Sequence, residues 1–145
     1  MAKETPLQAA DRIFHQWHEF TRRNDIEAAL ALYAPDAMLE SPLVPALLDG
    51  WPSGVLRGQQ ELRPFVEAAI RKRPNDAIRG YRTGGYLTDG RMLFWEYPRA
   101  TPQGDQLELA EVMEIEDGLI RCHRIYWGWV GFDRLLKHAR DRTAR

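Results

Sequence analysis

The sequence predicts an α+β domain in which helices come first and an antiparallel sheet follows. Two observations favour this class. Apolar residues recur at three- and four-residue steps in the first half of the chain, whereas they alternate with polar residues over residues 91–99 and 107–129 in the second half. The length of 145 residues suits one domain with one core, so we assign residues 1–145 to a single domain.

The first expected element is a helix that begins at residues 5–8. Thr5 can cap the helix, Pro6 suits its first turn, and Gln8 stands where the partner of a capping box belongs. The apolar stripe that follows consists of Leu7, Ala10, Phe14, Trp17 and Thr21.

Two further helices are expected before the sheet. Asn24-Asp25 interrupts the first pattern and can cap a short second helix from Ile26 to Tyr33, after which residues 37–40 read as a short strand. The third helix is expected from Gln59 to Arg73. Its buried stripe would consist of Leu62, Phe65, Val66, Ala69 and Ile70.

Residues 41–58 hold three prolines and three glycines. This composition is typical of a surface loop. Long loops in compact domains are often functional, so a second interpretation stays open: a lid in which Trp51 and Leu47 cover an apolar site.

The later half predicts the sheet and a last helix. Residues 78–88 form a weak strand, and residues 91–99 form a stronger one in which Leu93, Trp95 and Tyr97 share a face. Residues 101–105 turn the chain into a hairpin over residues 107–129. A short helix is expected from Phe132 to Arg142.

The hairpin carries a Glu, an Arg and a His on a mostly apolar face. With Asp117-Gly118 as a two-residue loop, Glu111 would oppose Arg124. With a three-residue loop over residues 116–118, Glu111 would oppose His123, and Leu109 would oppose Ile125. We favour the second register because it pairs apolar residues with each other and joins the two odd polar residues.

A carboxylate beside an imidazole can hold and move one proton near neutral pH, which acid–base catalysis requires. Glu111 and His123 are therefore the candidate catalytic residues. Arg121 could keep Glu111 ionised or receive an anionic oxygen of a ligand. It could equally reach the rim of the pocket and meet solvent. The alternative interpretation is a buried structural pair that satisfies its own polarity.

The net charge, the apolar runs and the spacing of potential ligand residues argue against several classes of function. The formal net charge of −1 gives no global attraction to nucleic acid or to a membrane surface. No apolar run approaches the ~20 residues of a membrane span, and the start of the chain has no apolar signal core, so we expect a cytoplasmic protein. Histidines and cysteines do not cluster at metal-ligand spacing, and no phosphate-binding glycine loop occurs. We expect neither a metal nor another cofactor.

Three motifs carry a resemblance to a known family: Asn24-Asp25-Ile26-Glu27 before ALALYAPDAMLESP, Leu56-Arg57-Gly58 before the third helix, and residues 116–120 followed by Tyr126-Trp127. With these motifs the chain resembles the nuclear-transport-factor-2-like superfamily, in its SnoaL-like and ketosteroid-isomerase-like branch, from about residue 8 to 136. The resemblance implies a cystatin-like roll. In it, a strongly curved antiparallel sheet wraps around three N-terminal helices as a cone and leaves a deep apolar pocket.

The resemblance also implies where the site lies. Ser41 stands where ketosteroid isomerases carry their base Asp, Trp17 stands where they carry a Tyr, and Glu111 stands where they carry an acidic oxyanion-hole residue. Only one of these three parts is kept, so steroid isomerisation is not expected. The residues expected to contact a ligand are Trp17, Tyr33, Ser41, Phe65, Trp95, Leu109, Arg121 and Trp127.

Two functions fit these features. The first is a cofactor-free isomerase, cyclase or lyase that acts on a small apolar carbonyl compound by acid–base chemistry. The second is a non-catalytic protein of the same fold that binds a small apolar molecule or serves as an accessory subunit. The resemblance implies a homodimer, and the outward face of the sheet, which would carry Phe94, Val112, Tyr126 and Trp129, is apolar enough to form its contact.

Overall fold

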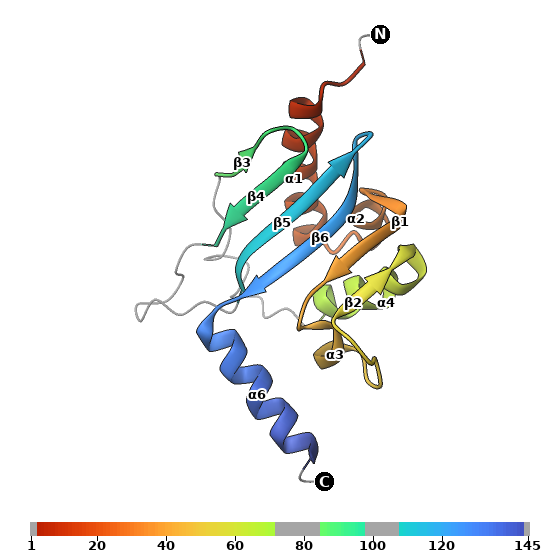
Figure 1. Cartoon of the computed structure of the whole chain (residues 1–145). Helices are drawn as coiled ribbons and strands as arrows, with labels where there is room; N and C mark the ends of the chain where they lie inside the picture. Colours follow the sequence, from red (N-terminus) through yellow and green to blue (C-terminus); the bar gives the residue numbers. More distant parts are fainter. Residues whose placement is uncertain (1–2, 72–84, 98–107, 144–145) are drawn as a thin grey trace.

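The computed structural model describes residues 3–71, 85–97 and 108–143, and these residues form a curved, open sheet of six strands. Its order is β2-β1-β6-β5-β4-β3 (Figure 1). The strands are β1 (Tyr33–Glu40), β2 (Val55–Arg57), β3 (Leu87–Thr88), β4 (Met92–Glu96), β5 (Glu108–Glu116) and β6 (Leu119–Trp127). Neighbouring strands run antiparallel except for β1 and β6, which are parallel. The α+β class and the curved sheet are thus confirmed.

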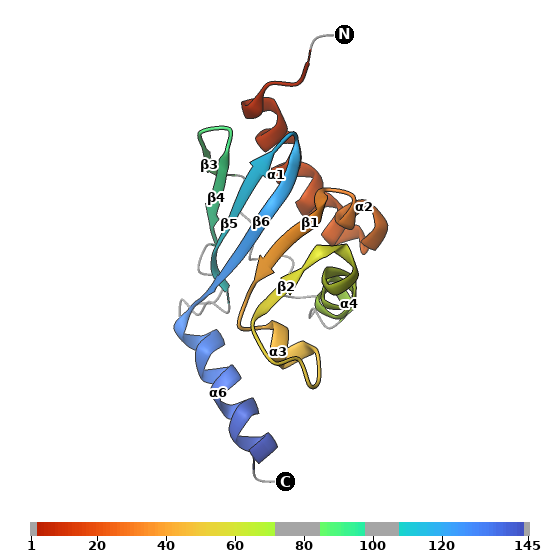
Figure 2. The same cartoon turned by 45° about the vertical axis from the view of Figure 1, so that its right-hand side comes forward.

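Three helices lie against one face of this sheet (Figure 2): α1 (Pro6–Arg23), α2 (Ile26–Leu30) and α4 (Gly58–Arg71). The short helix α3 (Val44–Leu47) precedes β2, and α6 (Trp129–Thr143) continues from the end of β6 past the sheet. None of the described helices covers the opposite face of the sheet. Within the described part of the chain, no helix is long and apolar enough to cross a membrane.

Helix α1 begins as the sequence predicts. The Gln8 backbone N–H donates to Thr5 Oγ1 at 3.3 Å, and the Thr5 backbone N–H donates to Gln8 Oε1 at 2.9 Å, which is a complete capping box. Asn24 ends the helix with a left-handed backbone. The buried face packs on the sheet and consists of Ala9, Ala10, Ile13, Phe14, Trp17 and Thr21.

The second predicted helix is shorter than expected. It ends at Leu30, and Tyr33 is instead the first residue of β1. The cause is pairing with β6: the Ile120 backbone N–H donates to the Leu32 carbonyl at 2.8 Å, and Tyr33 lies beside Ile120 in the sheet. The strand predicted at residues 37–40 therefore starts four residues earlier.

Residues 41–58 are not a plain surface loop. They contain α3 and β2, and the side chains of Val44 and Leu56 are fully buried. Trp51 is half-buried against the core, and its indole N–H donates to the Val55 carbonyl at 3.2 Å. The predicted strand at residues 78–88 and the turn at residues 101–105 fall mostly or wholly outside the described residues.

The β5–β6 turn has two residues, because Asp117 and Gly118 both have positive φ angles, of 50° and 76°. Glu116 therefore opposes Leu119, and Ile115 opposes Ile120. The register then shifts between this pair and the pair Glu114–Cys122, which leaves Arg121 as the extra residue of a β-bulge.

This bulge overturns both registers considered from the sequence. Beyond it, Met113 opposes His123 and Glu111 opposes Ile125, so neither Arg124 nor His123 lies directly across from Glu111. The bulge also reverses the alternation of β6. Ile120 faces the core on one side of it and His123 faces the core on the other, while Arg121 is exposed.

A glycine in the turn between β3 and β4 makes close contact with the start of α1. Gly90 has a φ of +90°, and a Cβ atom built on it would lie 2.8 Å from Pro6 Cβ. Gly50 has a similar φ of +78° but nothing within 4 Å of its would-be Cβ. A side chain at either glycine would strain the backbone, but only a side chain at Gly90 would also clash with a neighbouring residue.

We expect Gly90→Ala to lower the free energy of unfolding by about 1–3 kcal/mol more than Gly50→Ala, because only the first adds a clash to the left-handed strain. Urea unfolding of both variants measures the difference. Equal losses would show that the contact between Gly90 and Pro6 does not constrain α1.

Candidate functional site

A small cavity of about 40 Å³ lies between the helices and the concave face of the sheet. Its described lining is mostly apolar, with polar groups gathered on the sheet side. The lining residues are Trp17, Thr21, Ala29, Tyr33, Leu39, Leu43, Phe65, Val66, Ala69, Ile70, Glu108, Glu111, His123 and Ile125.

The size of this cavity limits what it can hold. A water molecule needs roughly 10–15 Å³ on the same measure, so the described cavity has room for a few waters or for one small functional group. Sites for drug-sized ligands are about 300–1,000 Å³. The deep pocket implied by the family resemblance is thus a small cavity in the part of the chain that the structure describes.

A continuous chain of hydrogen bonds forms one wall of the cavity. Glu111 Oε2 and His123 Nε2 lie 2.6 Å apart, and His123 Nδ1 and the Tyr33 phenol oxygen lie 2.7 Å apart. The Trp17 indole N–H donates to the same phenol oxygen at 3.2 Å. At the other end, the Tyr97 O–H donates to Glu111 Oε1. Glu111 and His123 are each only 1% exposed.

The sheet brings Glu111 and His123 together diagonally. His123 is two residues before Ile125, the residue directly across from Glu111, and diagonal neighbours on one face of a sheet lie within reach of long side chains. Glu111 and His123 are therefore in contact, as the sequence predicted, although the strand register from which this contact was predicted is wrong. Tyr33 joins them because its strand, β1, is the other neighbour of β6.

The proton distribution in this chain depends on burial. A buried carboxylate and a buried imidazole each disfavour an unpaired charge, and together they can share one proton. Burial raises the pKa of the Tyr33 phenol well above its ordinary value. The hydrogen bond from Trp17 acts against this rise, and the Glu111 carboxylate adds to it. Tyr33 therefore keeps its proton at neutral pH.

Of the residues expected to contact a ligand, Trp17, Tyr33 and Phe65 line the cavity together with Glu111 and His123. Trp95 is buried outside the lining, with its ring centroid 5.6 Å from that of Trp17 and 5.0 Å from that of His18. A role for Trp95 in ligand contact stays a prediction.

Ser41 and Trp127 lie outside this cavity, in a separate hollow of about 440 Å³ where β1 and β6 end. The Trp127 indole N–H is 3.4 Å from Ser41 Oγ, which also accepts the Leu43 backbone N–H at 3.1 Å. Ser41 thus organises the start of the segment at residues 41–58. A role in ligand contact stays a prediction for both residues.

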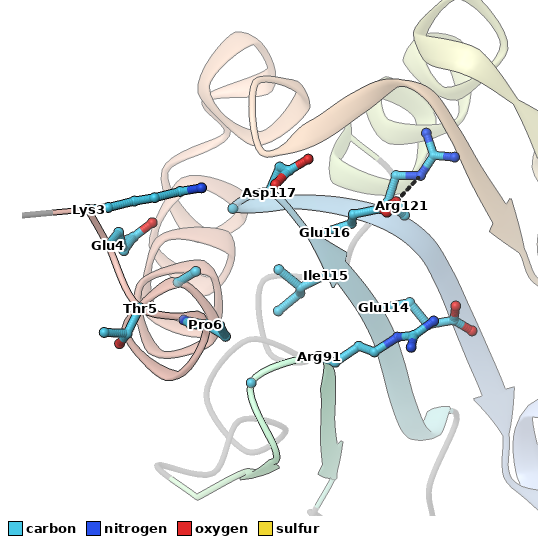
Figure 3. A pocket seen from close by; sticks show the side chains of 13 residues that line it. Lys3, Glu4, Thr5, Pro6, Arg91, Glu114, Ile115, Glu116, Asp117 and Arg121 are labelled. Carbon is cyan, nitrogen blue, oxygen red and sulfur yellow. Dashed lines mark ion pairs between the residues drawn. The ribbon is translucent and has the colours of Figure 1, made fainter.

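The inward orientation predicted for Leu109 is wrong, and of the two positions considered for Arg121 the structure has the one in solvent. The register of β5 shifts next to Leu109, whose side chain is 38% exposed. Arg121, the extra residue of the bulge, points out toward Asp36 and pairs with Glu116 at 3.2 Å. It lines a surface trough of about 1030 Å³ between the start of α1 and the β5–β6 turn (Figure 3). The walls of this trough carry charges of both signs, so it favours no ligand class.

Two features of the site were missed from the sequence. Tyr97 was placed on the inward face of its strand, but its bond to Glu111 was not foreseen. Glu108 lines the cavity at the start of β5. Alternation along β4 gave the signal for Tyr97, since Trp95 lies directly across from Glu111 and Tyr97 is the next residue on that face.

No metal site is apparent in the described ranges, where no three His, Cys, Asp or Glu side chains are grouped to hold an ion. The hydrogen-bonded chain at the cavity wall instead contains the phenols of Tyr33 and Tyr97, the carboxylate of Glu111 and the imidazole of His123. Such a set can donate, accept and relay protons.

Known proteins share the sequence pattern and the fold of this chain. A family model described as a SnoaL-like domain matches residues 14–123. A solved NTF2-like protein of unknown function from Burkholderia pseudomallei is 18% identical, with a TM-score of 0.66 over 88% of this chain and 96% of that one. A SnoaL-like protein of unknown function from Burkholderia thailandensis is 21% identical, with a TM-score of 0.63 over 83% and 94% of the two chains.

An LEH-like epoxide hydrolase from M. tuberculosis is 16% identical, with a TM-score of 0.55 over 94% of this chain and 96% of that one. At these identities the likeness concerns the fold alone. A search of curated proteins finds no match to the sequence.

The buried pair predicts a strong stability coupling. We expect His123→Phe alone to lower the free energy of unfolding by about 3–5 kcal/mol, because it leaves Glu111 buried without its imidazole. Adding Glu111→Met should restore at least about 2 kcal/mol of this loss, since the double variant buries no charge.

Urea unfolding of the two single variants and the double variant measures this coupling. The matched control is Glu114→Gln, which breaks a partly exposed ion pair with Arg124 on the outer face of the same two strands. It should cost less than about 1 kcal/mol. Additive losses at Glu111 and His123 would contradict the coupling.

Proposed function

The chain belongs to the family of SnoaL-like domains, and from that premise we propose that it is a cofactor-free enzyme of the isomerase, cyclase or lyase type. Its substrate would be a small, largely apolar carbonyl compound whose reacting end enters the cavity. The observation that carries this proposal is the buried Glu111–His123 couple at the wall of an apolar cavity.

The chemistry follows from the groups in the lining. An acid–base enzyme acting beside a carbonyl needs a group that takes a proton from carbon and a donor that stabilises charge on oxygen. The carboxylate and imidazole of the Glu111–His123 couple supply the first, and the Tyr33 phenol, in the same chain of hydrogen bonds, supplies the second. Apolar walls from Phe65, Val66 and Ile125 favour an apolar substrate and strengthen these interactions by excluding water.

A non-catalytic binding protein is the second candidate, and the small size of the described cavity favours it. A site of about 40 Å³ that already has internal hydrogen bonds can anchor one polar group of a ligand without any proton transfer. Turnover separates the two candidates, since a binding protein shows affinity alone.

We also propose that the protein is a homodimer joined through the outer face of the sheet. Phe94 and Tyr126 are exposed on this face, and Trp129 at the start of α6 is 76% exposed. Exposed apolar residues gathered on one face are typical of protein–protein contacts.

Acid–base chemistry next to a carbonyl can be tested without the natural substrate. We expect the wild-type protein to accelerate exchange of the α-hydrogens of 2-butanone and cyclopentanone in D₂O, followed by ¹H NMR. Glu111→Gln should reduce the rate by about 10²–10⁴-fold, because it removes the proton-accepting carboxylate. Glu114→Gln, on the outer face of the same strand, is the control and should keep the wild-type rate.

A folded wild-type protein that binds these ketones but leaves their exchange at the buffer rate would favour the binding protein. Circular dichroism of Glu111→Gln establishes that its loss of rate is not a loss of fold.

The dimer is tested by light scattering after size-exclusion chromatography. We expect a mass near twice that of the chain for the wild type, and dissociation for Phe94→Glu, which places a charge within the proposed contact. The control is Leu7→Glu, which changes an exposed apolar residue at the start of α1. A monomeric wild type would refute the proposal.

A further inference from the structure

Helix α6 carries an apolar stripe that the rest of the described chain covers only in part. Four residues at three- and four-residue steps form the stripe: Phe132, Leu135, Leu136 and Ala139. Phe132 is 49% exposed, Leu136 is 36% exposed, and Trp129, which extends the stripe toward the sheet, is 76% exposed. The rings of Trp129 and Phe132 lie 6.2 Å apart. The helix therefore presents apolar surface to solvent over about three turns.

One side of the stripe borders an apolar groove, which we call the α3–α6 groove. It has a volume of about 490 Å³, with α6 as one wall and the chain around α3 as the other. The described residues of the second wall are Pro42, Pro45 and Ala46. His138 lines the groove on the α6 side, and every other described lining residue is apolar. A groove with such walls suits the apolar face of an amphipathic helix.

Within the described chain, α6 has little of the packing that stabilises a helix. It runs from the end of β6 past the edge of the sheet (Figures 1 and 2), and no described strand or helix packs extensively against it. An isolated helix as short as Trp129–Thr143 is marginal in water, because most helical stability in proteins comes from packing of the apolar face. An apolar helix seated in the α3–α6 groove would supply this packing.

The stripe is complementary to a second copy of itself. If two α6 helices pack antiparallel about the point between Leu135 and Leu136, Leu135 of one copy lies opposite Leu136 of the other. Phe132 then lies opposite Ala139, so that a large side chain meets a small one at both ends of the contact. A two-fold symmetric dimer requires such a self-complementary surface. The pattern therefore favours a second copy of this chain over an unrelated helix.

The charges beside the stripe favour the antiparallel direction. Asp133 and Lys137 lie four residues apart on one flank of the stripe, and they form an ion pair of 2.7 Å along the helix. An antiparallel copy would bring its Lys137 beside Asp133, and its Asp133 beside Lys137, so that the four charges alternate in sign. A parallel copy would instead bring like charges together. The antiparallel direction also places opposite ends of the two helix dipoles side by side.

We propose that the α3–α6 groove is the docking site for α6 of a second copy of this chain. The two α6 helices pack antiparallel, and the stripe of each helix fills the groove of the other copy. The proposal goes beyond the function proposed above and shares with it only the expectation that two copies associate. Trp129 connects this contact with the one through the sheet, because it lies between the end of β6 and the stripe.

A single charge in the stripe tests the contact. We expect Leu136→Glu to raise the dissociation constant of the dimer by more than about 10-fold, because it places a carboxylate in the apolar groove of the other copy. Sedimentation velocity over a dilution series measures this constant, and circular dichroism establishes that the variant is folded. The control is Arg134→Glu, which adds the same side chain at an exposed position two residues away, off the face of the stripe.

The outcomes separate this contact from the one through the sheet. A Leu136→Glu dimer as tight as the wild type would overturn the inference, and the contact through the sheet would stand if Phe94→Glu still dissociates the dimer. A wild type that is monomeric would refute both contacts and would leave the groove to a partner other than this chain.

Charge changes on the flank test whether the two helices meet across copies. Asp133→Lys makes the pair of flank charges wholly basic, and Lys137→Glu makes it wholly acidic. We expect each variant alone to dimerise more weakly than the wild type, and an equal mixture of the two to form predominantly the heterodimer in native mass spectrometry. A mixture with no more heterodimer than random pairing gives would overturn the inference.

Discussion

The contact between Glu111 and His123 is the constraint on which the interior of this protein depends. Each side chain is almost completely buried, and neither can stay in an apolar core without the other. Their atoms come from different strands, so the contact exists only in one register of the β5–β6 hairpin. A one-residue slip would place one of the two in solvent and the other alone in the core.

The bulge at Arg121 reconciles this requirement with the turn. The two-residue turn at Asp117-Gly118 sets Ile115 against Ile120, and both face the core. Continued without interruption, the alternation of β6 would turn His123 outward. The extra residue restores its inward direction and sends the guanidinium of Arg121 out to Asp36. The surface ion pair between Arg121 and Asp36 thus lies at the bulge, where the inward and outward alternation of β6 is reversed.

Much of the fold follows from local patterns in the sequence. The capping box at Thr5 and Gln8 and the alternation of β4 were both visible, and the structure has each of them. The predicted stripe of α1 is buried except for Leu7, which is exposed at the start of the helix. These features depend on residues that are close in sequence, and for such residues the spacing of apolar and polar side chains is enough to predict the local structure.

The errors share a different cause. The spacing of Ile26, Ala29, Leu30 and Tyr33 fits a helix face, but Tyr33 belongs to a strand because β6, far along the chain, pairs with it. The bulge adds one residue to β6 and leaves no mark in the alternation, which placed Arg121 on the inward face or at its rim. Both features are set by contacts between distant segments, which override local propensity. The chain of hydrogen bonds through Tyr33 depends on the β1–β6 pairing and on the bulge. The sequence therefore suggested Tyr33, His123 and Glu111 as site residues, but it did not predict the hydrogen bonds between them.

The parallel pairing of β1 with β6 also bears on how the chain is made. Tyr33 and His123 are 90 residues apart, and a ribosome adds about 5–20 residues per second, so roughly 5–20 seconds separate their appearance. During that interval α1 and α2 exist without the sheet that buries their apolar stripes. The apolar stripes of the N-terminal half therefore lack their partner strands until the β5–β6 hairpin is synthesised, and the Tyr33–His123 contact can form only after that.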